Sequence, residues 1–206
     1  MRLYHLQFVR FWCLMPDTKM TNTHVNYFGY GANADLKMMQ AITGRADFIG
    51  RPAILTGHRL GIQRLDQVPI VPRRILEEAW GPSFQTYVAV PESGSMINGV
   101  LWRIDEEARK LIRNWELVEE EVGLELAWRK EAHLASVALP NGVSAYGIQT
   151  EILGDDQAFD EATVVDGTNY PLFLMPRESV LKAATLEREA YLARIGMEGK
   201  PPTRER

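Results

Sequence analysis

The chain has 206 residues, a hydrophobic fraction of 46%, a charged fraction of 24% and a net charge of -4. These values are typical of one globular domain whose core is large enough to fold without cross-links, and the mildly acidic balance argues against a dedicated nucleic-acid binder. The single cysteine, Cys13, excludes an internal disulfide and fits a reducing compartment, so we expect a cytoplasmic protein. The four histidines are scattered and no cysteine cluster accompanies them, so we expect no metal site.

Residues 1–25 are interpreted as an N-terminal extension. The apolar run from Leu3 to Met15 is too short for a membrane span, and His5 and Arg10 interrupt it. No small-residue cleavage site follows a clean apolar stretch, which argues against a signal peptide. We expect no membrane association, and we expect this segment to pack on the surface or to pair with a partner.

A strand, a turn and a helix are predicted over residues 26–44. The apolar residues from Tyr27 to Tyr30 predict a short buried strand, and the glycines on both sides of Tyr30 let the backbone approach a ligand. Asp35 begins a short amphipathic helix that ends at Gly44. Backbone N–H groups at such a turn suit a carboxylate or a phosphate, and an ordinary tight turn is the alternative.

Residues 45–104 are predicted to be rich in β-structure, because short apolar runs alternate with Gly and Pro turn signals. Residues 66–82 hold three prolines and are predicted to form a long loop, which is usually functional or mobile. Arg73 and Arg74 lie in this segment. They are candidates for contact with an anionic substrate, and the alternative, which we favour, is a solvated loop.

A helix is predicted from Asp105 to Glu121, with Asp105 as its N-cap, because apolar residues recur there at helical spacing. Residues 127–134 and 143–152 are predicted to be two strands, since the Asn-Gly turn at residues 140–142 is a strong hairpin signal.

The remainder of the chain is predicted to contain a loop at residues 154–170 and one or two closing helices at residues 176–195. The domain is taken to span residues 26–198, and residues 199–206 are taken as a frayed tail.

Four blocks, in the same order along the chain, resemble the gamma-glutamylcyclotransferase family. Tyr27–Asn33 is similar to the Tyr-Gly-Ser-Asn signature of that family, with Ala32 where serine is usual. The other blocks are Gly57–Leu60, Thr86–Pro91 and Ile97–Asp105. The resemblance implies an α+β fold, a small mixed β-barrel with flanking helices.

The resemblance also implies an activity, the release of an amine or amino acid from a gamma-glutamyl amide or peptide with formation of 5-oxoproline. This chemistry needs no cofactor. Counting without gaps from the last block, the catalytic glutamate of the family falls on Glu116, and Arg113 and Leu117 stand where the family has aspartate and glycine. The apolar neighbours of Glu116 suit a carboxylate that moves a proton. Glu121 is the alternative if the register slips by an insertion.

The family pocket implies a set of substrate-binding residues around a small gamma-glutamyl substrate. They are Tyr30, Gly31, Ala32, Asn33, Ala34 and Asp35, through their backbone N–H groups, and Trp128, where relatives commonly have a tyrosine. A late tyrosine also lines the pocket in relatives, and the choice between Tyr170 and Tyr191 stays open. The alternatives to a cyclotransferase are a hydrolase-type enzyme on another small amide and a non-catalytic binding or scaffold module. A homodimer is left open.

Overall fold

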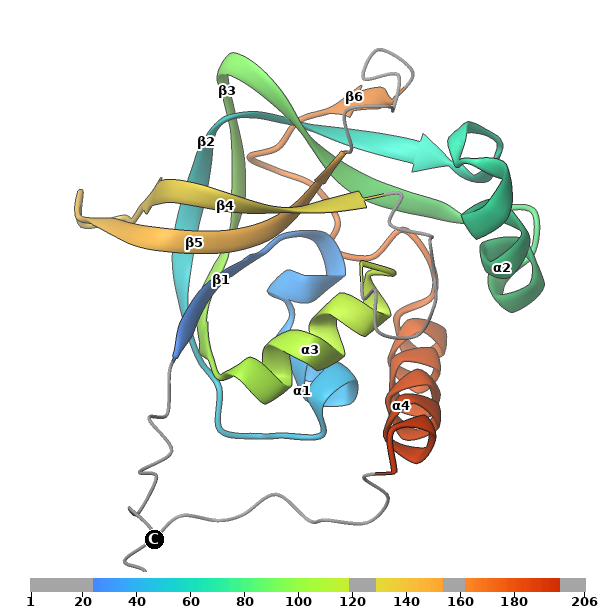
Figure 1. Cartoon of the computed structure of the whole chain (residues 1–206). Helices are drawn as coiled ribbons and strands as arrows, with labels where there is room; N and C mark the ends of the chain where they lie inside the picture. The colour runs from blue at the N-terminus through green and yellow to red at the C-terminus, as the bar shows by residue number, and fades with distance from the viewer. Residues whose placement is uncertain (1–23, 119–128, 154–161, 197–206) are drawn as a thin grey trace, which may run out of the picture.

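The protein is described by a computed structural model that covers residues 24–118, 129–153 and 162–196. Over these residues it is a five-strand mixed β-barrel with a sixth strand outside the barrel and four α-helices (Figure 1). The strands are β1 (Val25–Gly29), β2 (Ile49–Arg64), β3 (Gln85–Ile104), β4 (Arg129–Ala138), β5 (Ser144–Leu153) and β6 (Thr163–Val165). The helices are α1 (Leu36–Thr43), α2 (Ile70–Trp80), α3 (Glu106–Trp115) and α4 (Arg177–Arg194).

The barrel is a ring of strands in the order β3-β1-β5-β4-β2, and the pairing of β2 with β3 closes it. β1 pairs antiparallel with β3 and parallel with β5, so the ring is mixed. β6 adds to β2 outside this ring. Closure leaves no unpaired edge between the five strands. The predicted α+β fold with a small mixed β-barrel is confirmed.

The long β2–β3 hairpin is the largest part of the barrel. The apolar runs that predicted several short strands over residues 45–104 all belong to these two strands. The register shifts once, between Thr56 and His58, where Gly57 adopts the left-handed conformation at φ 73°. The prediction of β-structure is confirmed, although it split each strand into pieces.

The predicted loop at residues 66–82 is wrong, because most of it forms α2. Pro69 caps this helix and Pro72 is its third residue, a position whose N–H has no partner within a helix, so proline costs no hydrogen bond there. Arg73 donates from Nε to the Val68 carbonyl at 2.8 Å and from Nη2 to the Asp66 carbonyl at 2.7 Å. Arg73 therefore fastens the start of α2 to the preceding turn.

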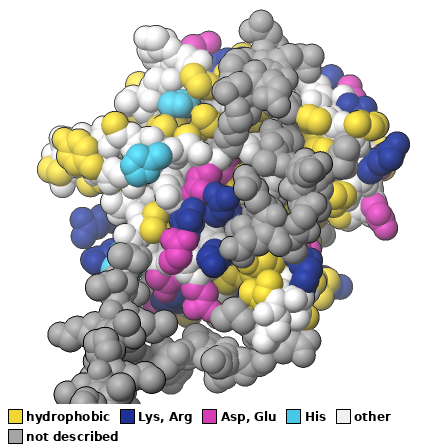
Figure 2. Space-filling model, viewed as in Figure 1, with side chains coloured by type: hydrophobic (Ala, Val, Ile, Leu, Met, Phe, Trp, Pro, Cys, Tyr) yellow, Lys and Arg dark blue, Asp and Glu magenta, His cyan; other side chains and the backbone are white. Residues whose placement is uncertain are grey.

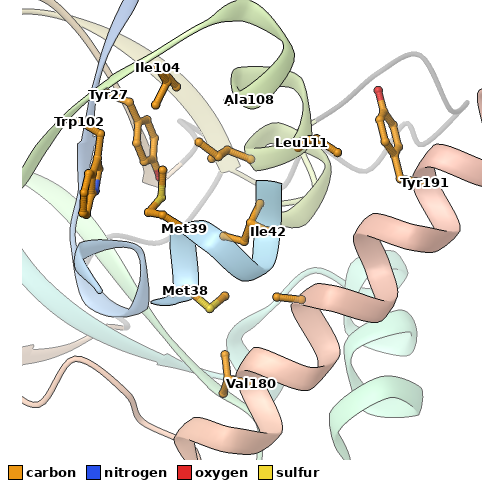
Figure 3. Close-up of a cluster of buried hydrophobic side chains, with 12 residues drawn as sticks. Tyr27, Met38, Met39, Ile42, Trp102, Ile104, Ala108, Leu111, Val180 and Tyr191 are labelled. Carbon is orange, nitrogen blue, oxygen red and sulfur yellow. The ribbon is translucent and has the colours of Figure 1, made fainter. Parts of the chain in front are cut away.

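Two buried clusters lie on the two faces of β1 and β3. Alternate residues of β1 point to opposite faces, so Phe28 fills the barrel interior and Tyr27 faces the helices. Figure 3 shows the helix side, where α1 and α4 bring Met39, Ile42 and Val180 toward Tyr27 and the other core side chains. Each fully buried side chain of this kind contributes about 1.5–3 kcal/mol to folding. The barrel and its helices thus share β1 and β3 as a common wall.

The other helices and strands that the sequence predicted are present, with different ends. α3 begins at its predicted cap, where Asp105 accepts a hydrogen bond from the Ala108 N–H, but it ends at Trp115. Residues 154–161 of the predicted loop lie outside the described residues, and the rest of it contains the short strand β6. Residues 177–194 form one helix, α4. None of the helices in the described part of the chain is long and apolar enough to cross a bilayer.

Candidate active site

A cavity of about 480 Å³ opens between one end of the barrel, α2 and α4. Its polar end is lined by the turn after β1, by Glu116 at the end of α3, and by Arg129 and Glu151 of the β4–β5 hairpin. The rest of its wall is made by α2, α4, the end of α3, residues 84–87 and residues 172–175. Its volume is within the range of small-molecule sites in proteins.

The turn after β1 is a tight 3₁₀ turn over Gly31–Ala34 that needs both of its glycines. A Cβ atom on Gly29 would lie 2.3 Å from the Asn33 carbonyl oxygen, and Gly31 has φ 56°. The indole N–H of Trp102 donates to that same Asn33 carbonyl at 2.8 Å. The turn is therefore folded back on the end of β1, and residues 30–33 line the cavity.

Glu116 lies beside this turn in the cavity wall, at the C-terminal cap of α3. Its carboxylate is 10% exposed and accepts from Asn33 Nδ2 at 2.8 Å and from Arg129 Nη1. The apolar setting expected from its sequence neighbours is not what surrounds this carboxylate, because an amide and a guanidinium hold it. The sequence separation between Asn33 and Glu116 shows that the barrel assembles this contact from distant segments.

Arg113 and Leu117, which depart from the pattern that the sequence resembles, both lie at the end of α3. Leu117 has φ 58°, and the Val118 N–H donates back to the Arg113 carbonyl at 2.9 Å. This is the Schellman motif, in which a right-handed helix ends with one residue in the left-handed conformation. A glycine would adopt this conformation without strain, whereas leucine is strained in it, so a positive φ explains why glycine suits this position.

Arg113 ties the same helix end to β4. It donates to the Val118 carbonyl at 3.0 Å and pairs with Glu131, which also accepts from Arg109 at 2.9 Å. Figure 2 shows that acidic and basic side chains lie next to one another on the face of the molecule drawn there. Arg113 therefore supports the position of Glu116 from the outer side of α3.

Glu151 is a second carboxyl group of the site, and the sequence did not single it out. It is 4% exposed, and its Oε2 accepts a hydrogen bond from the Tyr27 hydroxyl at 2.8 Å. Burial, and then the nearby charge of Glu116, raise the pKa of Glu151 to about 8. Burial is also the main reason why the pKa of Tyr27 is raised well above its ordinary value, so Tyr27 remains a donor.

Asn33 connects the two carboxyl groups. Its Nδ2 donates both to Glu116 and to the Tyr27 hydroxyl, each at 2.8 Å, and Tyr27 then donates to Glu151. Because both of these neighbours accept, the amide nitrogen must face them. Its Oδ1 is buried and has no hydrogen-bond partner within the described residues. Asn33 thus joins Glu116 to Tyr27 and Glu151 and keeps one buried acceptor without a partner among these residues.

Arg129 is the second residue of the site that the sequence did not single out. It is the first residue of β4, its side chain is 7% exposed, and it pairs with Glu116. It also donates to Thr86 Oγ1 and to the Tyr87 carbonyl, the latter at 3.2 Å. Arg129 therefore joins the end of α3 to β3 and holds Glu116 against the barrel.

The predicted site residues are only partly gathered in the cavity. Tyr30, Gly31, Ala32, Asn33 and Glu116 line it together. Ala34 and Asp35 do not line it, and Asp35 instead caps α1 by accepting from the Met38 N–H at 3.0 Å. Trp128 lies outside the described residues.

The two tyrosines left open by the sequence have different places. The Tyr170 hydroxyl lies 3.4 Å from the Gly31 nitrogen and donates to the Asn98 carbonyl, and burial raises the pKa of Tyr170 to about 12. Tyr191 is 2% exposed in the cluster between the helices. Of the two, Tyr170 is therefore the one beside the turn.

One signal in the sequence would have drawn attention to Glu151. The Asn-Gly turn sets the register of the β4–β5 hairpin, which places Glu131 directly opposite Glu151. Two acids opposite each other on paired strands are unfavourable unless one finds a cation or keeps its proton. Here Glu131 has two arginines, and Glu151 has the raised pKa.

No group of three or more His, Cys, Asp or Glu side chains is placed to hold a metal ion in residues 24–118, 129–153 and 162–196. The polar end of the cavity offers acid–base and hydrogen-bonding groups: the carboxyl groups of Glu116 and Glu151, the guanidinium of Arg129 and the amide of Asn33. Such a set can hold a small polar substrate and move a proton.

Comparison with known proteins gave similarity to solved structures alone. No family model matches the chain, and no curated protein matches it. The chain is similar to a gamma-glutamyl cyclotransferase, with 13% identity, TM-score 0.49, and coverage of 89% of this chain and 93% of that chain. It is similar to an uncharacterized protein from Homo sapiens, with 12% identity, TM-score 0.49, and coverage of 89% and 91%. These likenesses concern the overall fold and assign no activity to this chain.

Proposed function

We propose that the protein is a cyclotransferase that converts a gamma-glutamyl amide to 5-oxoproline and a free amine, with Glu116 as its acid–base group. The observation that supports it is the hydrogen bond of 2.8 Å from Asn33 to Glu116, which joins the turn after β1 to a nearly buried carboxylate in one cavity. The reaction itself is the one implied by the resemblance of four sequence blocks to the gamma-glutamylcyclotransferase family. The single cysteine suggests the cytoplasm as its compartment.

The reaction needs positioning and one proton transfer. The α-amine of the glutamyl group attacks its own γ-carbonyl carbon, so a new C–N bond closes a five-membered ring. The C–N bond to the leaving amine then breaks. Glu116 takes the proton from the attacking nitrogen and returns it to the leaving nitrogen, so atoms and charge balance without an oxidant or a second reactant. Holding the substrate bent in this geometry provides most of the acceleration.

The other groups of the site have roles consistent with this chemistry. Glu151, with its pKa raised to about 8, is mainly a carboxylic acid at pH 7, which leaves the base role to Glu116. The turn at residues 30–33 is the place for the substrate α-carboxylate, through its backbone N–H groups.

A binding module without catalysis is the second candidate, because the Arg129 ion pair already occupies one oxygen of Glu116. The two candidates differ in one measurement. Incubation with a panel of gamma-glutamyl amines and peptides gives 5-oxoproline if the protein is a cyclotransferase, whereas a module binds one of them without turnover. A hydrolase gives free glutamate instead.

The role of Glu116 is tested by Glu116→Gln, which keeps the volume of the side chain but cannot carry the proton. We expect turnover to fall on the order of a hundredfold or more, with an unchanged circular dichroism spectrum. Glu116→Asp is the matched control, because it keeps the charge that faces Arg129 and moves the carboxylate by one methylene, and we expect a smaller loss. Full activity in Glu116→Gln together with a loss in Glu121→Gln would show that the register assigned here is wrong.

A further inference from the structure

The cavity has a second compartment beyond its polar end, and this compartment is apolar. α2 contributes Ile75, Leu76 and Ala79, and α4 contributes Ala183, Leu186 and Ala190. Ile75 is 38% exposed and Leu186 is 55% exposed. These side chains are continuous with the wall that holds Glu116, so whatever is attached to the reacting carbonyl extends over them.

The cavity is larger than a glutamyl group. A cavity of about 480 Å³ is within the range of about 300–1,000 Å³ that receives drug-sized ligands, whereas a glutamyl group has only about nine non-hydrogen atoms. The remainder is enough for an amine the size of a short alkyl or phenylalkyl group. The leaving amine is therefore the part of the substrate that the apolar compartment receives.

The charges around the compartment disfavour an anionic leaving group. Glu187 lines it and accepts from Asn114 Nδ2 at 3.0 Å. Within the described residues, the lining has one cationic side chain, Arg129, which lies at the polar end and pairs with Glu116.

The arginines of α4 are outside the lining and have other contacts. Arg177 pairs with Asp35, Arg188 donates to the Ala41 carbonyl at 2.7 Å, and Arg194 donates to Asn114 Oδ1 at 3.1 Å. A free carboxylate on the leaving amine would thus enter an apolar, acidic space in which the described residues place no cation for it, which costs free energy.

We infer that the substrate is a gamma-glutamyl amide of an apolar amine without a carboxylate, and that α2 and α4 select this amine. The inference depends on the proposed function for the reaction, but it also predicts which gamma-glutamyl compounds bind more tightly, whether or not they react. It excludes peptides and gamma-glutamyl amino acids as the preferred substrates.

Three compounds test this inference in pairs that differ by one group. Gamma-glutamyl phenethylamide and gamma-glutamyl phenylalanine differ only by the carboxylate, and gamma-glutamyl ethylamide lacks the ring. We expect kcat/KM for the phenethylamide to exceed that for each of the other two by about tenfold or more, since even one methylene in an apolar pocket discriminates by about tenfold. Equal or better turnover of the phenylalanine compound would overturn the inference and leave the proposed function intact.

Binding separates the inference from the reaction. Titration calorimetry of the same compounds against Glu116→Gln is expected to give the same order of affinity without turnover. If no compound yields 5-oxoproline with the unmodified protein, the proposed function fails, and the order of affinity still decides the inference. An order that favours gamma-glutamyl phenylalanine would refute it.

A variant of the compartment gives the second test. Leu186→Glu adds a charge to the apolar wall, and we expect the ratio of kcat/KM for the phenethylamide to that for the ethylamide to fall about tenfold. The matched control is Val143→Glu, at a 57% exposed residue outside the cavity lining, in the β4–β5 turn on the side away from α2 and α4 (Figure 1). An unchanged ratio in Leu186→Glu would contradict the role given to α4.

Discussion

Glu151 makes the stability of the protein depend on pH in a direction opposite to that of most carboxylates. Its pKa is raised from 4.5 to about 8 in the folded protein, mainly because it is buried. Between these two values the folded protein keeps a proton that the unfolded chain has lost. Stability is therefore highest below pH 4.5 as far as this group is concerned, and it falls as the pH rises toward 8.

The size of this effect follows from the two pKa values. One pKa unit corresponds to about 1.4 kcal/mol, so a change from 4.5 to about 8 amounts to roughly 5 kcal/mol of lost stability above pH 8. Relaxation of the site and entry of water reduce this figure, so it is an upper value. A loss of even half this size is a large part of the stability of a small domain.

The variant Glu151→Gln removes this titration while it keeps an oxygen that accepts from Tyr27. We expect the free energy of unfolding in urea to be similar in both proteins at pH 5, and to be higher in the variant by about 2–5 kcal/mol at pH 9. The exposed Glu78→Gln is the control, and it is expected to follow the unmodified protein.

A second variant checks the cause of the raised pKa. The charge of Glu116 is its second cause after burial, so Glu116→Gln is expected to weaken the pH dependence without removing it. If Glu151→Gln and the unmodified protein lose stability in parallel from pH 5 to pH 9, Glu151 does not keep its proton and the reasoning is refuted.

Two further predictions concern the helix end and the N-terminal segment. Leu117 has φ 58°, so Leu117→Gly is expected to be more stable than Leu117→Ala by about 1 kcal/mol in urea unfolding, because both variants lose the leucine packing and only alanine is strained. The opposite order would show that the left-handed conformation is not kept. Cys13 lies outside the region that resembles the family, so Cys13→Ala and prolonged chelation are expected to leave the rate of 5-oxoproline formation unchanged, and complete inactivation of a folded Cys13→Ala protein would exclude the mechanism proposed here.

The parts of the fold that the sequence predicted are those with local causes. The turn after β1 depends on two glycines and a cap at Asp35, and the β4–β5 hairpin depends on an Asn-Gly turn, all within a few residues. α2 was missed because prolines usually indicate a loop, whereas Pro72 lies at a helical position that needs no N–H.

The parts of the candidate site that the sequence missed have causes that are distant along the chain. Glu151 is buried because β1 packs beside β5, and Arg129 is a site residue because it reaches both Glu116 and β3. A single sequence carries the residue types at these positions but not the pairing of strands that brings them together. Glu116 was found through the resemblance, although its surroundings differ from those its neighbours suggested.

β1 meets β5 only after most of the chain is available, and this determines when the site forms during folding. Thr150 Oγ1 donates to the Phe28 carbonyl at 2.7 Å across a separation of 122 residues, whereas the β2–β3 and β4–β5 hairpins close locally. Because long loops cost more entropy to close, the hairpins are expected to form early and β1 to dock late. Tyr27 and Asn33 reach Glu151 and Glu116 only in that docked state, so regain of ligand binding after dilution from urea reports the completed barrel, and it should lag behind the regain of strand structure.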